Sequence, residues 1–213
     1  MMGAARPALG RVPGLTFWKL CGAGSGAGFE PRLNMGVVGL LCVWESAGAA
    51  DAALEDAPIF AAYRRRASEH WTIRLATVSA RGRWSGRVPF DAARTTAEGP
   101  LAVLTRATLR PRALPGFWPR VPGVSAAVAG NRTVLFRIGL GEVPFLQQIT
   151  FSVWPDAAAM RAFAGGGHHA RAVAAVRRGN WFREELYARF VVTGEAGTWG
   201  GRRDILGAGP RAA

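Results

Sequence analysis

Lysine is almost absent from this 213-residue chain, and cysteine and histidine are scarce. The two cysteines, Cys21 and Cys42, have neither the paired spacing of a zinc site nor the number that a disulfide framework needs, so buried free thiols are expected. The three histidines, His70, His168 and His169, are too few and too close in sequence for an iron site of two separated histidines and a carboxylate.

Long hydrophobic runs are also missing. Hydrophobic residues make up 49% of the chain and the mean hydropathy is +0.09, yet no apolar run approaches the roughly 20 residues that cross a bilayer. Segment 1–15 carries Arg6 and Arg11 and lacks the continuous apolar stretch of a secretory signal. These features argue against an integral helical membrane protein and predict a cytoplasmic one.

Motifs of hydrolases and phosphate-binding proteins are lacking as well. No Gly-x-Ser-x-Gly sits between a predicted strand and helix, so a serine hydrolase is poorly supported. Segment Gly22–Gly28 alternates glycine with small residues, never gives the G-x-G-x-x-G spacing and is not followed by Gly-Lys-Ser/Thr. A flexible hairpin loop is the expected structure.

Acidic residues are outnumbered by arginine, and the net charge is +13. Such a surplus favours anionic partners such as nucleic acid or an acidic membrane surface, but biased genomic base composition also produces it. The arginines are scattered, with neither a basic tail nor the aromatic-basic motif of an RNA-binding sheet. We expect no nucleic-acid partner and retain peripheral contact with an anionic membrane.

What the chain does contain is an internal repeat, with copies about 110 residues apart. The matched features are Trp44 with Trp154, Trp71 with Trp181 and, after a five-residue insertion in the second copy, Gly82–Gly86 with Gly197–Gly201. Duplicated domains usually pack about a shared pseudo-twofold axis. We therefore expect a ligand to lie at the seam between the copies.

The second half reads as strand, helix, strand, strand, helix and strand. The expected ranges are Leu101–Leu109, Leu114–Ala129, Thr133–Leu140, Gln147–Trp154, a helix capped by Asp156 that breaks at 165–167 and resumes over His168–Arg178, and Leu186–Thr193. This order is ferredoxin-like, with an antiparallel sheet and both helices on one face.

The first half repeats the order from its helix onward. The expected ranges are Met2–Val12, Thr16–Cys21, Val37–Trp44, Ala47–Glu69 and Thr72–Val78. The strand that should open this copy is missing, so we expect that about 20 residues were lost from the start and that a sheet edge is exposed. The predicted fold is α+β: two tandem ferredoxin-like repeats, packed sheet to sheet as a dimeric α/β barrel-like pseudo-dimer.

The expected division follows from these elements. Residues 1–86 form the first repeat, 87–99 a linker, 100–201 the second repeat and 202–213 a disordered tail.

Five polar residues are candidates for chemistry. His168 and His169 open the resumed helix, where the helix dipole favours a neutral ring that can bind a metal. His169 precedes an apolar stripe and could ligate a haem, the alternative being a capping or surface pair. Lys19 and Arg137, at equivalent places in the second strand of each copy, face either solvent or an anion such as a haem propionate. Glu142 could carry protons or pair with an arginine.

Long, ordered segments of the chain resemble the spheroidene monooxygenases, carotenoid oxygenases of purple photosynthetic bacteria. These segments include Phe17–Gly22, Glu55–Pro58, Leu104–Ala107, Ile138–Pro144, Thr150–Ala157, His169–Ala172, Trp181–Phe182 and Glu184–Phe190. The resemblance implies an oxygen-dependent enzyme that converts C2 of an acyclic carotenoid, spheroidene, to the alcohol and then to the ketone of spheroidenone. It also implies haem and a reduced ferredoxin-type electron donor, which agrees with the lack of an acid-base motif.

The resemblance also ranks the candidates. His169 matches the family pattern and is the expected iron ligand, whereas His168 does not match; Cys21 is the alternative, because thiolate ligation supports oxygen activation. Lys19 and Arg137 are the expected cofactor-binding residues. Family members carry an opening strand that this chain lacks. The competing function is a non-catalytic ferredoxin-like protein that binds a lipid or pigment.

Overall fold

The structure is a computed structural model that describes residues 2–24, 33–91, 98–123, 126, 130–164, 174–176 and 178–207. Its strands are β1 (Leu15–Gly24), β2 (Leu33–Trp44), β3 (Trp71–Gly82), β4 (Leu101–Leu109), β5 (Phe136–Gly141), β6 (Gln147–Trp154) and β7 (Phe182–Gly197). Its helices are α1 (Met2–Leu9), α2 (Ala47–Asp56), α3 (Pro58–Arg66), α4 (Leu114–Phe117) and α6 (Ala157–Ala164), with 3-10 turns η1 (Pro111–Ala113) and η2 (Trp118–Arg120).

The strands form one seven-stranded antiparallel sheet in the order β2-β1-β5-β6-β4-β7-β3. Within it, β5-β6-β4-β7 is the ferredoxin-like order of the second repeat. The first repeat contributes the hairpin β2-β1 at one edge and β3 at the other. The predicted fold of two ferredoxin-like units is therefore confirmed, and among the described residues no strand equivalent to β4 lies between β2 and β3.

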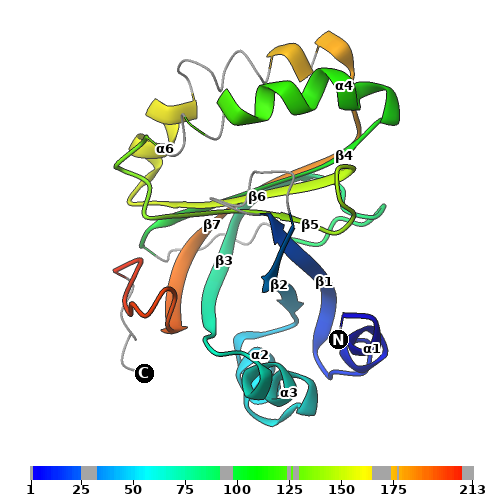
Figure 1. The fold of residues 1–213 in the computed structure, drawn as a ribbon. Coiled ribbons are helices and arrows are strands. Elements are labelled where there is room, and N and C mark those ends of the chain that lie inside the picture. Colours follow the sequence, from blue (N-terminus) through cyan, green and yellow to red (C-terminus); the bar gives the residue numbers. More distant parts are fainter. Residues whose placement is uncertain are drawn as a thin grey trace.

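The two repeats join edge to edge, which corrects the expected stacking of separate sheets. Strand β3 pairs with β7 from Trp71 opposite Gly197 to Gly82 opposite Leu186. The second junction is short, because β1 meets β5 only at Gly22 opposite Gly141 and the adjacent pair. In Figure 1 the helices of the second repeat cover one side of the assembly and α1, α2 and α3 lie at the other.

The inner face of this sheet carries the main core. Alternate side chains of a strand point to opposite faces, so each strand gives one set of residues to the inner face and the other to the helices. The inner cluster draws buried residues from both repeats: Phe17, Cys21, Trp84, Phe90, Ala102, Leu104, Ile149, Phe151, Val153, Leu186, Ala188, Phe190, Val192 and Leu206. Because β2 and β3 also pack on this cluster through Val43 and Ile73, the sheet curls around it.

The sheet is open between its edges β2 and β3. Val43 of β2 and Ile73 of β3 are only partly buried, although both face the inner core. Their counterparts in the second repeat, Val153 and Ala188, are 0% and 1% exposed. The difference follows from the neighbouring strands, since β4 lies between β6 and β7 and pairs with both, whereas no described strand lies between β2 and β3 in the same way.

Prolines account for two departures from the expected helices. The predicted helix over 47–69 is two helices, because α2 ends at Asp56 and Pro58 begins α3. The predicted helix from Leu114 contains the 3-10 turn η2 around Pro119, as the missing backbone N–H of proline favours. By contrast, β4 and β6 have the predicted bounds, and the Asp156 carboxylate accepts a hydrogen bond from the Ala159 N–H as a helix cap.

The predicted linker and tail contribute to the core. Phe90, expected in a linker, is 5% exposed and packs edge-on against Phe190 with ring centroids 5.0 Å apart. Leu206, expected in a disordered tail, is 3% exposed, and the Glu195 carboxylate accepts hydrogen bonds from the N–H groups of Ile205 and Leu206. The second repeat therefore extends at least to residue 207, while 208–213 lie outside the described residues.

Candidate functional site

The pseudo-twofold symmetry is most evident in two turns that follow β3 and β7. Trp84 bridges to Arg87 after β3, and Trp199 bridges to Arg202 after β7. A glycine precedes each turn, Gly82 at φ +94° and Gly197 at φ +93°. A Cβ at Gly82 would lie 2.1 Å from the carbonyl oxygen of Glu185 in β7, and one at Gly197 2.1 Å from that of His70, the residue before β3. Both positions therefore require glycine for its backbone conformation and for its missing side chain.

A glutamate from the opposite repeat holds each turn. Glu184 accepts hydrogen bonds from the N–H groups of Ser85 and Gly86 at 2.9 and 2.7 Å. Glu69 accepts them from Gly200 and Gly201 at 2.8 and 2.7 Å. Glu69 is thus as far from Glu184 in sequence as Trp84 is from Trp199. The insertion of the second copy therefore lies before Glu184. As a result, the counterpart of Trp71 is Leu186 and not the predicted Trp181.

Among the described residues, one of the two turns, that of Trp84, meets a buried charge network, and this network is the candidate functional site. Lys19 Nζ lies 2.9 Å from Glu142 Oε1. Arg106, which is 1% exposed, binds Glu184 through Nη1 and lies 3.9 Å from Glu142 Oε2 through Nη2. Trp84 Nε1 donates to Glu142 Oε2 at 2.6 Å. Two cations and two carboxylates, from β1, β4, β7 and the end of β5, thus meet at the inner face.

This network neutralises its own charges. Burial raises the pKa of the Glu184 carboxyl group, but the N–H groups of Gly86 and Ser85 together with the charge of Arg106 lower that pKa below its ordinary value. Glu184 therefore stays ionised, which a buried arginine requires. Because Arg106 Nε is buried and has no hydrogen-bond partner, the guanidinium depends on its carboxylate contacts.

Cys21 lies on the inner face, two residues along β1 from Lys19. It is 2% exposed and belongs to the main core cluster. Burial, and next the charge of Glu142, raise the pKa of its thiol to about 12, although Lys19 and Arg106 act in the opposite direction. The thiol is thus protonated at neutral pH and enclosed by packed side chains, which is a poor fit to a thiolate ligand of a haem.

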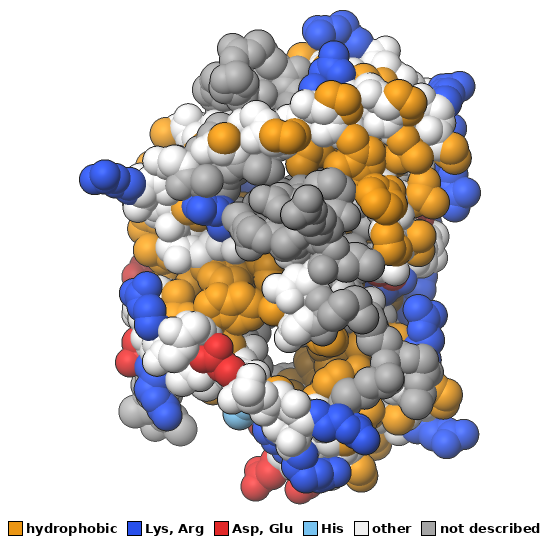
Figure 2. Space-filling model, in the orientation of Figure 1, with side chains coloured by type: hydrophobic (Ala, Val, Ile, Leu, Met, Phe, Trp, Pro, Cys, Tyr) orange, Lys and Arg blue, Asp and Glu red, His pale blue; other side chains and the backbone are white. Residues whose placement is uncertain are grey.

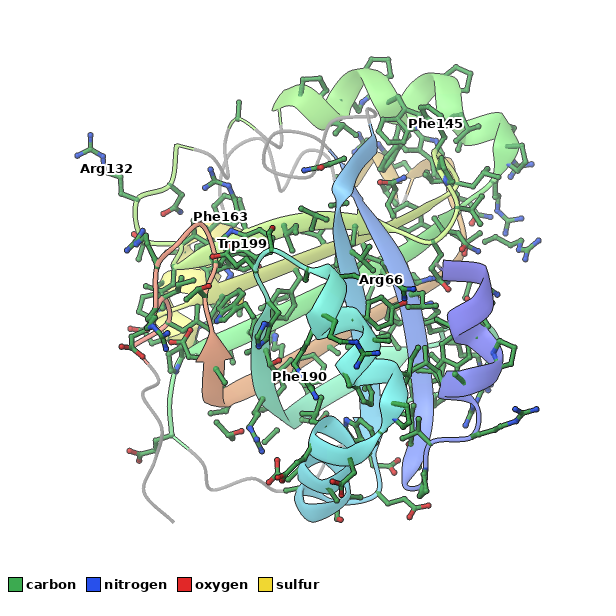
Figure 3. The ribbon with its side chains drawn as sticks, turned by 60° about the horizontal axis from the view of Figure 1, so that its bottom comes forward. Arg66, Arg132, Phe145, Phe163, Phe190 and Trp199 are labelled. Carbon is green, nitrogen blue, oxygen red and sulfur yellow. The ribbon has the colours of Figure 1, made fainter. Side chains whose placement is uncertain are left out.

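At the opposite end of the strands from the charge network, the inner face carries an aromatic cluster that joins both repeats. Trp71, Phe136 and Trp199 pack with ring centroids 4.6 Å (Trp71 to Phe136), 5.3 Å (Phe136 to Trp199) and 6.1 Å (Trp71 to Trp199) apart. Trp71 Nε1 donates to Glu195 Oε2 at 3.0 Å, which fixes the orientation of its ring. Trp199 is 36% exposed and carries the cluster to the surface, where it is labelled in Figure 3.

The structure separates the two basic residues that the sequence placed at equivalent positions. Lys19 pairs with Leu41 of β2, whereas Arg137 pairs with Ser152 of β6. Leu41 lies one residue farther from Trp44, the end of β2, than Ser152 lies from Trp154, the end of β6. The two hairpins therefore differ in register by one residue, and Ile138 is the counterpart of Lys19. Lys19 points to the inner face and Arg137 to the opposite one, and they cannot contact one haem together.

Other expected residues have different outcomes. His168 and His169 lie outside the described residues. Glu142 pairs mainly with Lys19 rather than with an arginine. Among the described residues, no group of three or more histidine, cysteine, aspartate or glutamate side chains could hold a metal ion. In the same part of the chain, no helix is long and apolar enough to span a membrane.

The sequence reasoning missed Arg106 and Glu184. A signal for Arg106 was present in the sequence, because Ala102, Leu104 and Arg106 are alternate residues of one strand and therefore share its inward face. An arginine on that face needs a carboxylate partner. Its partner Glu184 comes from another strand, and no local pattern identifies which acid that is.

Comparison of the sequence finds three relatives of one name. The chain is 43% identical over 197 residues to a spheroidene monooxygenase of Cereibacter sphaeroides, covering 91% of this chain and 61% of the relative. It is 39% identical over 206 residues to that of Rhodobacter capsulatus, covering 95% of this chain and 85% of the relative. It is 39% identical over 197 residues to that of Rubrivivax gelatinosus, covering 92% of this chain and 76% of the relative. The chain thus spans less than two thirds of the first relative's length.

Two other comparisons complete these findings. No family model matches the chain. Among solved structures, the chain is similar to an anthrone oxidase-like protein, with 11% identity, a TM-score of 0.36 and coverage of 94% of this chain and 88% of that one. It is similar to an antibiotic biosynthesis monooxygenase at 15% identity and a TM-score of 0.37, with 47% of this chain and 97% of that one covered.

Proposed function

Because the chain belongs to the spheroidene monooxygenase family, we propose that it acts as an oxygen-dependent carotenoid monooxygenase. The proposed reaction places a hydroxyl and then a keto group at C2 of a spheroidene-type acyclic carotenoid, giving spheroidenone from spheroidene. The observation that carries this proposal is the 39–43% identity to three relatives of that name over 91–95% of the chain.

The inner face supports an apolar substrate. A carotenoid is a long polyene, and aromatic side chains bind such a chain through large apolar contact areas. Trp71, Phe136 and Trp199 offer this surface at the seam between the repeats. At the other end of the inner face, the network of Lys19 and Glu142 provides a fixed polar end for a long substrate that gains an oxygen atom.

The oxidant is part of the proposal. Oxygenation of an unactivated C–H bond needs a redox cofactor, and haem with electrons from a reduced ferredoxin-type donor would supply it. Each oxygenation takes up one O2, two electrons and two protons, places one oxygen atom on carbon and releases the other as water. The second oxygenation at the same carbon gives a gem-diol, which loses water to form the ketone. We propose His169 as the iron ligand, since the buried, protonated thiol of Cys21 fits that role poorly.

We also propose that the protein works in the cytoplasm at a membrane surface. Carotenoids partition into bilayers, so an enzyme acting on one gains from membrane contact. The net charge of +13 favours an anionic surface.

Expression in a host that accumulates spheroidene tests the activity. Under air, we expect a red-shifted ketone pigment in cells that contain the folded chain and no ketone in cells kept anaerobic. If folded protein copurifies with unchanged spheroidene under air, the oxygenase proposal fails and the alternative, a non-catalytic lipid- or pigment-binding protein, is supported.

Haemin titration tests the cofactor. We expect a shifted Soret band that His169→Ala abolishes and Cys21→Ala leaves in place. A band that persists in His169→Ala, or that only Cys21→Ala removes, would contradict the proposed ligand.

A further inference from the structure

The loop between β5 and β6 carries an exposed apolar tip. Val143 and Phe145 are 43% and 48% exposed, and Pro144 between them is exposed as well. Phe145 has φ +65°, a left-handed conformation that is unfavourable for a bulky residue. An aromatic ring held at the surface at the expense of backbone strain indicates that the ring itself is needed there.

Helical segment 111–120 continues this apolar surface. Trp118 packs edge-on against Phe145 with ring centroids 5.5 Å apart, and Phe117 packs on Trp118 at 5.6 Å. Figure 3 shows Phe145 beneath this segment. In Figure 2, hydrophobic side chains gather on the same side of the molecule below α4, and a second group of them lies at the centre left of the view. We call Trp118, Val143, Pro144 and Phe145 the apolar tip.

Positive charge lies on the helical segment that carries Trp118. The segment that carries Trp118, residues 110–123, contains three arginines and no acidic residue. Of these, Arg112 and Arg120 are exposed, and Arg120 also lies over the Trp181 ring at 5.2 Å. Exposed aromatic and aliphatic side chains flanked by arginine are the combination that binds the interface of an anionic bilayer.

We propose that the apolar tip docks the protein on a lipid bilayer with anionic headgroups. Phe145 and Val143 enter the boundary between headgroups and acyl chains, and Arg112 and Arg120 contact the headgroups. The carboxylate of Glu142, the residue before Val143, belongs to the inner charge network. Docking therefore places the end of the inner face beside the bilayer, which, resting on the proposed function, is where a carotenoid would enter.

Phe145→Gly tests the apolar contribution with a built-in folding control. Glycine suits φ +65°, and the relief of backbone strain offsets part of the packing lost against Trp118, so we expect this variant to stay folded, which its melting temperature checks. In co-sedimentation with vesicles of phosphatidylcholine and phosphatidylglycerol, we expect the affinity to fall by about tenfold or more. Leu135→Ala, at the residue before β5 and 37% exposed in the wild type, is the matched control and leaves binding unchanged.

Arg112→Ala tests the charge contribution. Loss of one arginine at an anionic surface lowers affinity about fivefold. Arg132→Ala is the matched control, because Arg132 is exposed and lies well away from Phe145 in Figure 3. The wild type is expected to bind vesicles of phosphatidylcholine alone far more weakly.

Three outcomes would overturn the docking proposal. These are equal binding of wild type and Phe145→Gly, equal binding to neutral and anionic vesicles, and a Phe145→Gly effect on self-association rather than on vesicle binding, which would assign the tip to a second copy of the chain. Because the vesicles contain no carotenoid, failure of docking leaves the oxygenase proposal standing, and failure of oxygenation leaves docking standing.

Discussion

Replacing Glu184 by glutamine should destabilise the protein much more than the same change at its symmetry-related position. Glutamine has one acceptor oxygen in place of two and presents an amide N–H₂ group to Arg106, so the guanidinium loses its main counter-charge. Removing one partner of a buried ion pair costs about 3–5 kcal/mol. We expect about 3 kcal/mol, the low end of that range, because Glu142 Oε2 remains 3.9 Å from Arg106 Nη2.

The repeat supplies the control. Glu69→Gln removes one acceptor from the equivalent pair of backbone hydrogen bonds, to Gly200 and Gly201, and within the described residues Glu69 forms no ion pair with an arginine. The difference between the two variants therefore reports the stranded charge of Arg106 rather than the turn. Chemical denaturation gives the free energy of unfolding, and about 3 kcal/mol corresponds to a melting temperature roughly 6–12 °C lower for a chain of this size.

A double variant decides the mechanism. Arg106→Met removes the charge, so Arg106→Met with Glu184→Gln should be more stable than Glu184→Gln alone. Equal losses for Glu184→Gln and Glu69→Gln, or no recovery in the double variant, would refute the assignment of the destabilisation to Arg106.

Three further predictions follow from the same contacts. Gly82→Ala should cost at least about 2 kcal/mol in the free energy of unfolding, while Gly22→Ala, whose Cβ meets nothing within 4 Å, should change it little; similar values would contradict the close approach at Gly82. Burial raises the pKa of Cys21 and Cys42 to about 12, so iodoacetamide at pH 8 should label neither thiol by mass spectrometry until the protein is unfolded. Because the folded protein holds the pKa of Glu184 below its ordinary value of 4.5, ionised Glu184 stabilises the fold above pH 4.5, and this stabilisation is lost as pH falls through the lowered pKa. The melting temperature should therefore drop below about pH 4.5, and it should drop less steeply in Glu184→Gln.

Local periodicity was enough to predict most elements of the second repeat. Strands β4 and β6 have the predicted bounds, since alternating or continuous apolar runs ended by proline, glycine or tryptophan depend only on neighbouring residues. The capping aspartate Asp156 was also correct, because its hydrogen bond spans three residues. Short-range chemistry of this kind is contained in the sequence itself.

The candidate site depended on longer-range information. A one-residue difference in strand register places Lys19 and Arg137 on opposite faces, and a comparison of sequence positions does not detect such a shift. Similarly, Arg106 and Glu184 come from different strands, and only the pairing of β4 with β7 brings them together.

The sequence by itself thus determined the duplication, the order of strands and helices within each repeat and the family, because each rests on residues that are adjacent or regularly spaced. The tertiary structure decided how the repeats join, which faces Lys19 and Arg137 occupy and which carboxylates neutralise the buried Arg106. The physical reason is that register and curvature of the sheet arise from contacts between strands distant in sequence, so the burial and the counter-charge of a side chain are properties of the assembled sheet.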